Sequence, residues 1–176
     1  MQRYDYSCGA AALTTMFVYY FRDAVTEQRV LDTIFTRLKN APGTKNQVED
    51  RVKNGLSMLD LQQAAADLGY QSAVAKITLE QTRKLEAPVV VRIIKNDFKH
   101  FVVLRGIVDE HAFLADPIRG NIRIREAEFL RQWNYVALFL GKEGFGLPKD
   151  HPLALHVSLP VAVEREQARR ALFPWP

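Results

Sequence analysis

The chain has 176 residues, of which 48% are hydrophobic and 25% are charged, a composition typical of one globular domain with its own core. Its formal charge is +4, but the Lys and Arg residues are spread along the sequence, which disfavours nucleic-acid binding. No apolar run approaches the roughly 20 residues of a membrane-spanning helix. The single cysteine excludes an intrachain disulfide framework and a metal site built from several cysteines.

The first half of the chain has the pattern of helices. From Cys8 onward apolar residues recur at helical spacing, and the small residues of the first turn would let another element approach closely. Thr26 is a good N-cap, and Ser57 with Asp60 forms a capping-box pattern that starts another helix. The predicted helices cover residues 8–21, 26–38 and 57–68, and the polar segment 40–55 is predicted to be a loop.

The second half changes to short β-branched and aromatic runs, which predict an antiparallel sheet interrupted by one helix over 126–133. Helices followed by a sheet indicate an α+β domain. We place this domain at residues 1–140. Residues 141–176 are punctuated by Pro and Gly, and we interpret them as a C-terminal extension that packs on the domain as an arm or contacts another subunit, as in a homodimer.

Cys8 is the first candidate for chemistry, although a lone cysteine beside an apolar helix stripe is more often inert. A thiol with a pKa near 8.5 is only a few per cent thiolate at neutral pH and needs activation. The predicted helix start supplies one activating influence, because its partial positive charge favours the anion. A base and a group that orients the base are also required.

His100 is the candidate base because it opens a strand, and a half-exposed side chain at a strand end can be held rigidly. The other three histidines, His111, His151 and His156, are expected at the surface. A hairpin turn centred near Val108 would make His100 face Asp116, with Cβ atoms ~5 Å apart.

Two other arrangements stay open for Asp116. A register shift of one residue would move it to the other face of the sheet, and it could instead cap its own turn in the segment ADPIRG. Asp109 is a competing acid, but it lies at the hairpin tip. For the developing oxyanion, the candidate donors are the backbone N–H of Cys8 and the side-chain amide of Gln2, worth ~3 kcal/mol for one good donor.

The segments QRYDYSCGAAAL, HFVVLRG and ADPIRG together resemble the C39 peptidases, papain-like cysteine proteases known as processing domains of bacteriocin exporters. The resemblance covers roughly residues 2–140 and implies a papain-like α+β fold without a cofactor or metal. It implies Cys8 as nucleophile, His100 as general base, Asp116 as the group that orients the imidazole, and Gln2 as oxyanion-hole donor.

The resemblance also implies a substrate, a peptide or protein cut after a Gly-Gly-type motif. The chain departs from the best-known members because no transporter segment follows and Ser7 stands where an acidic residue is common. A stand-alone chain of this kind is similar to the C39-like proteins encoded with bacterial functional-amyloid secretion systems. This similarity implies secretion-system partners and a periplasmic location with the export signal removed; the cytoplasm is the alternative.

Two alternatives to a cysteine endopeptidase are open at this point. The first is a non-catalytic binding module or chaperone that grips a Gly-rich segment during secretion, which the presence of both Cys8 and His100 disfavours. The second is acyl transfer to an amine, since the same three residues serve hydrolysis and transfer alike.

Overall fold

The computed structural model describes residues 7–40, 47–95 and 98–155. The first half is helical and the second half forms a six-stranded antiparallel sheet, which confirms the α+β prediction. The helices of the first half are α1 (Ser7–Thr15), the π-helix η1 (Met16–Tyr20), α2 (Glu27–Asn40), α3 (Gln47–Asn54) and α4 (Met58–Asp67).

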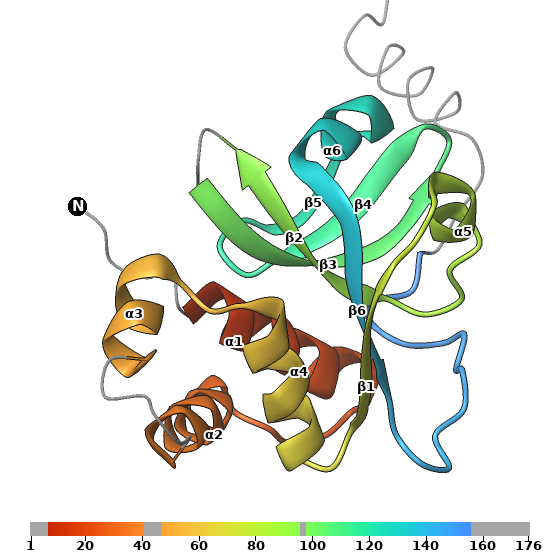
Figure 1. Ribbon diagram of the computed structural model, residues 1–176. Helices are drawn as coiled ribbons and strands as arrows, with labels where there is room; N and C mark the ends of the chain where they lie inside the picture. The colour runs from red at the N-terminus through yellow and green to blue at the C-terminus, as the bar shows by residue number, and fades with distance from the viewer. Residues whose placement is uncertain (1–6, 41–46, 96–97, 156–176) are drawn as a thin grey trace, which may run out of the picture.

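The sheet has the strand order β1-β6-β2-β3-β4-β5, and α1 packs against β3 while α4 packs against β1. Figure 1 shows α1 to α4 gathered in one half of the molecule and the sheet in the other. The elements of the second half are β1 (Gln71–Lys76), α5 (Leu79–Arg83), β2 (Val89–Lys95), β3 (Phe98–Val108), β4 (His111–Asp116), β5 (Gly120–Arg125), α6 (Glu126–Gln132) and β6 (Trp133–Gly141).

The first helix has the predicted apolar stripe, and Leu13, Met16 and Phe17 are fully buried. Its last turn widens into η1, so that the predicted helix over 8–21 is one α-helix continued by a π-helical segment. The stripe packs into a core that also holds Phe101 and Val103 of β3. Burial of this stripe therefore anchors the start of α1, with Cys8, against the middle of the sheet.

The prediction of a loop over 40–55 is wrong for residues 47–54, which form α3. Val48 packs against the core, and Arg51 Nε donates to Asp60 Oδ2 over 2.6 Å. Asp60 is also the N3 residue of the predicted capping box with Ser57, which is present at the start of α4. A polar helix that is marginal by itself is thus held by contacts with its neighbour, which its composition does not reveal.

Residues 142–155 follow the sheet and pack on the domain. Arg105 of β3 donates to the backbone oxygens of Leu153 over 2.9 Å and Ala154 over 2.7 Å, and Leu153 is part of the main core. His151 is buried with its ring 4.7 Å from that of Tyr20, so the prediction that it lies at the surface is wrong. His156 lies outside the described residues.

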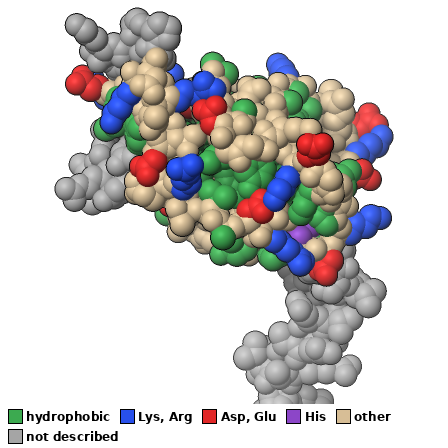
Figure 2. Space-filling view, turned by 90° about the horizontal axis from the view of Figure 1, so that it is seen from below, with side chains coloured by type: hydrophobic (Ala, Val, Ile, Leu, Met, Phe, Trp, Pro, Cys, Tyr) green, Lys and Arg blue, Asp and Glu red, His purple; other side chains and the backbone are tan. Residues whose placement is uncertain are grey.

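Charge is dispersed on the face shown in Figure 2, where Lys and Arg side chains alternate with acidic ones around a central hydrophobic area. This distribution agrees with the spread of basic residues along the sequence. In the described parts of the chain, no helix is long and apolar enough to cross a bilayer.

Candidate active site

His100 and Asp116 are in direct contact in the structure. His100 Nε2 lies 2.9 Å from Asp116 Oδ1, and both side chains are buried. The expectation of a half-exposed His100 is therefore wrong, because the strands and the turn around it cover the ring. Because an ionised carboxylate only accepts hydrogen bonds, Nε2 carries the proton and donates it to Oδ1. The other ring nitrogen, Nδ1, is buried and has no hydrogen-bond partner among the described residues, which leaves its lone pair for a proton from a nucleophile.

The hairpin that carries this pair turns about one and a half residues later than predicted, through Asp109 and Glu110. Both have positive φ, 47° and 59°, as a two-residue type I′ turn requires. The strand pairing shifts between Leu104 and Gly106, which makes Arg105 the extra residue of a β-bulge.

This bulge decides the face on which Asp116 lies. Val103 pairs with Ala115, so the next step of the ladder sets Asp116 opposite Val102. His100 precedes Val102 by two residues in β3 and therefore lies on the same face of the sheet. His100 and Asp116 are thus diagonal neighbours. The predicted face is therefore correct and the predicted directly facing register is wrong. Without the bulge, Asp116 would point to the opposite face.

Asp116 is held by four described donors. Its Oδ1 accepts from His100, from the Ile118 amide over 2.8 Å and from the Arg119 amide over 3.2 Å, while Oδ2 accepts from Arg119 Nε over 2.7 Å. Burial of this carboxyl acts to raise its pKa, but the hydrogen bonds from His100, Ile118 and Arg119 outweigh burial and lower the pKa from 3.8. Asp116 therefore caps its own turn and contacts His100, two roles that were alternatives in the sequence.

Cys8 is the second residue of α1 and is buried, with 3% of its surface exposed. The next residue, Gly9, lies so close to the sheet that an added Cβ would be 3.3 Å from the ring of Phe101, the residue after His100. The small residues of this first turn thus allow the close approach that the sequence predicted. Gln2 lies outside the described residues.

A pocket of about 370 Å³ opens beside His100. Its walls combine apolar side chains with two cations, and the residues that line it are Ile93, Lys95, Phe98, His100, Ile118 and Arg119. Arg119 was not among the site residues predicted from the sequence. The available signal was the short turn in ADPIRG, where a side chain three residues after Asp116 returns to its carboxylate.

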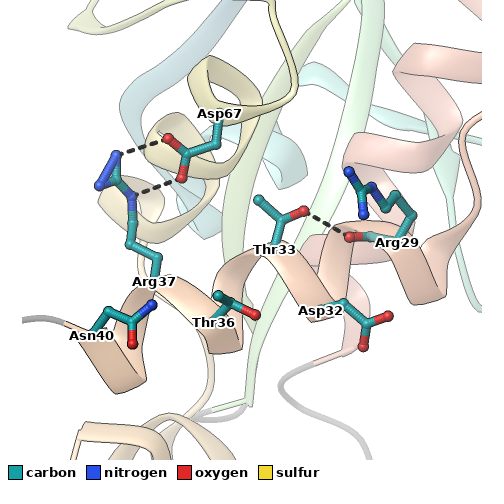
Figure 3. A pocket seen from close by; sticks show the side chains of 7 residues that line it. All are labelled: Arg29, Asp32, Thr33, Thr36, Arg37, Asn40 and Asp67. Atoms are coloured by element: carbon teal, nitrogen blue, oxygen red, sulfur yellow. Dashed lines mark hydrogen bonds and ion pairs between the residues drawn. The ribbon is translucent and has the colours of Figure 1, made fainter.

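A larger groove, of about 620 Å³, lies away from this pair in the helical half. Figure 3 shows its polar side chains along α2, with Arg37 in an ion pair with Asp67 of α4, at 3.0 and 3.1 Å. Its lining includes no cysteine or histidine, so it offers neither a thiol nucleophile nor an imidazole base. Among the described residues, no group of three or more His, Cys, Asp or Glu side chains could hold a metal ion.

The sequence profile of the Peptidase C39 family matches residues 44–144. The chain belongs to the Peptidase C39 family. The matched segment includes His100 and Asp116 and begins after Cys8, so the assignment of the nucleophile depends on the N-terminal motif and on the position of α1.

Two curated relatives support the family assignment. The chain is 30% identical over 145 residues to the "Probable functional amyloid protease FapD" of Pseudomonas fluorescens, and 28% identical to the protein of the same name from Pseudomonas aeruginosa. In each case the match covers 82% of this chain and 60% of the relative. The chain thus spans about three fifths of the length of these relatives.

Solved structures show the same fold. The peptidase domain of Streptococcus ComA, a bifunctional ABC transporter involved in quorum sensing, superposes with a TM-score of 0.62 at 19% identity, covering 81% of this chain and 96% of that domain. A double glycine motif protease from an AMS/PCAT transporter, solved in complex with the leader peptide, gives a TM-score of 0.59 at 24% identity, over 81% of this chain and 88% of that one. The papain-like fold prediction is confirmed.

Proposed function

We propose that this chain is a cysteine endopeptidase in which Cys8, His100 and Asp116 act as a catalytic triad. The observation that carries the proposal is the buried hydrogen bond from His100 Nε2 to Asp116 Oδ1. This bond holds the His100 ring in one orientation and leaves Nδ1 as its basic nitrogen. Fixing the imidazole in this way is the function of the third residue, here Asp116, in a catalytic triad.

In the proposed reaction, His100 Nδ1 removes the proton of the Cys8 thiol, and the thiolate attacks the carbonyl carbon of the scissile peptide bond. The imidazolium, stabilised by the Asp116 carboxylate, then gives its proton to the leaving amine as the C–N bond breaks. Water, deprotonated by His100, attacks the resulting thioester, and the acid product leaves as the thiol is restored.

Two features of α1 support Cys8 as the nucleophile. The helix begins at Ser7, so its partial positive charge favours the Cys8 thiolate. At a helix start the backbone N–H groups point toward the end of the helix, where they can donate to an oxyanion. We propose the Cys8 amide and the Gln2 side-chain amide as the two donors.

We further propose that the substrate is cut after a Gly-Gly-type motif. The match to FapD, named a functional amyloid protease, and the fold shared with a double glycine motif protease support a substrate that is itself secreted or belongs to a secretion system. Periplasmic location and secretion-system partners are proposed on the same ground. For residues 141–176 we favour an arm packed on the domain, because residues 142–155 are in contact with it.

The test is cleavage of Gly-Gly-containing peptides, and of secreted proteins encoded beside the gene, by wild type and the variants Cys8→Ala and His100→Ala. We expect cleavage by wild type alone, with rates of the variants reduced about 1000-fold or more. His111→Ala is the matched control, because this imidazole bonds only to the backbone oxygen of Asp109 on the described hairpin and should leave cleavage unchanged.

Binding of these peptides without cleavage, equally by wild type and Cys8→Ala, would contradict the proposal and support a binding module. The alkylation of Cys8 by iodoacetamide gives an independent measurement that needs no substrate. Since the chain has one cysteine, the intact mass reports this thiol alone. An activated thiol reacts well below pH 8, whereas an ordinary thiol follows a pKa near 8.5.

A further inference from the structure

Arg119 makes the only described contact with the second oxygen of the Asp116 carboxylate. Its Nε lies 2.7 Å from Oδ2, whereas His100 and two backbone amides donate to Oδ1. The Asp116 side chain is fully buried and the Arg119 side chain is 47% exposed. The guanidinium thus reaches inward from the surface to an oxygen that water does not touch.

The two oxygens of a carboxylate move together, so a donor on one determines the direction of the other. Removal of the Arg119 side chain would leave Oδ2 as a buried acceptor without a described partner, a state that costs free energy. The carboxylate would then rotate to recover a partner, and Oδ1 would leave its alignment with Nε2 of His100. We propose that Arg119 is a positioning residue that holds the His100 imidazole through Asp116.

This inference rests on the proposed function. It states that Arg119 affects catalysis through Asp116 and His100, and not by contact with the substrate. Arg119 also lines the pocket beside His100, where a cation could bind a substrate group by itself. The two effects can be separated. If Arg119 acts through Asp116, its substitution should have little effect once the Asp116 carboxylate has been removed.

The Arg37–Asp67 pair in Figure 3 is a matched control. It has the same chemical groups, joined by one hydrogen bond and a second close ion contact, but 39% of the Asp67 side chain is exposed. Water can therefore replace the arginine, as is usual for ion pairs at the surface. Arg37→Gln should leave the chemistry of Cys8 unchanged.

The experiment is a double-mutant cycle on the rate of Cys8 alkylation by iodoacetamide at about pH 6.5, where an ordinary thiol is almost wholly protonated. We expect Arg119→Gln to lower the rate roughly fivefold, as loss of one hydrogen bond to a charged group allows. Asp116→Asn should lower the rate further, and adding Arg119→Gln to Asp116→Asn should change it less than twofold. Arg119→Lys, which keeps a cationic donor, should recover most of the wild-type rate.

Two results would overturn the inference while the proposed function stands. One is an Arg119→Gln rate equal to that of wild type; the other is a full fivefold effect of Arg119→Gln in the Asp116→Asn background. With a cleaved peptide, a raised KM at unchanged kcat would likewise indicate substrate contact. If wild-type Cys8 reacts like an ordinary thiol and His100→Ala makes no difference, the proposed function fails and the inference falls with it. Melting temperatures separate these effects from unfolding, and Arg119→Lys provides a second, milder variant.

Discussion

Asp116 and Asp60 are two buried carboxylates with similar partners and different uses. Each accepts a hydrogen bond from an arginine Nε, over 2.7 and 2.6 Å, and each accepts from a backbone amide, over 2.8 and 2.7 Å. Asp60 completes a capping box with Ser57, whereas Asp116 contacts the imidazole of His100. Burial and an ion pair therefore do not distinguish the proposed catalytic carboxylate from the structural one. The imidazole partner of Asp116 does.

The largest effect expected from this comparison is that of Asp116→Asn on peptide cleavage. An amide at this position cannot stabilise the imidazolium as a carboxylate does, so kcat should fall about 100-fold or more. Asp60→Asn should instead lower the free energy of unfolding by about 1–2 kcal/mol, through the weakened cap and the lost ion pair, with kcat unchanged. Urea denaturation measures the free energy of unfolding of both variants, and steady-state kinetics measure their kcat. A loss of kcat in Asp60→Asn at full folding would contradict the division of roles.

The bulge that sets Asp116 on the face of His100 provides the next prediction, Gly106→Ala. Gly106 has a φ of +155°, and an added Cβ would lie 2.9 Å from Leu155 Cδ1. Strain at such a position is worth about 1–3 kcal/mol, and it is relieved if the strand pairing slips. We expect lower stability in urea together with slower alkylation of Cys8. Gly69→Ala is the control, because its φ is also positive but nothing lies within 4 Å of an added Cβ; equal effects of the two on alkylation would contradict the role of the bulge.

The smallest expected effect is on the pH dependence of stability. The pKa of Asp116 is lowered in the folded protein, so its stabilising contribution is complete above the unfolded value near 3.8 and is lost as pH falls through the lower folded value. The free energy of unfolding of wild type should therefore decrease with acidification below about pH 4 more steeply than that of Asp116→Asn. Urea titrations at several acidic pH values give the slope of the free energy of unfolding against pH for both proteins. Equal slopes would show that the Asp116 carboxyl does not contribute to the pH dependence of stability.

Much of the fold could be predicted from short-range patterns. Apolar spacing located α1 because a helix that buries a stripe must repeat every three to four residues, and Ser57 with Asp60 located the start of α4 because the cap is local. The α3 helix was missed because its support, Arg51 on Asp60, comes from another element. The burial of His151 was missed for the same reason, since Tyr20 lies far away in the sequence.

The candidate site divides in the same way. The sequence by itself determined which residues are proposed to carry chemistry: one cysteine at a helix start, one histidine at a strand end and one aspartate before a proline. Only the tertiary structure decided how His100 and Asp116 meet, because a bulge at Arg105 selects the face of Asp116 and a returning side chain, Arg119, contacts its second oxygen. Side-chain chemistry is a property of single residues, whereas register and burial depend on distant parts of the chain that the local pattern does not encode.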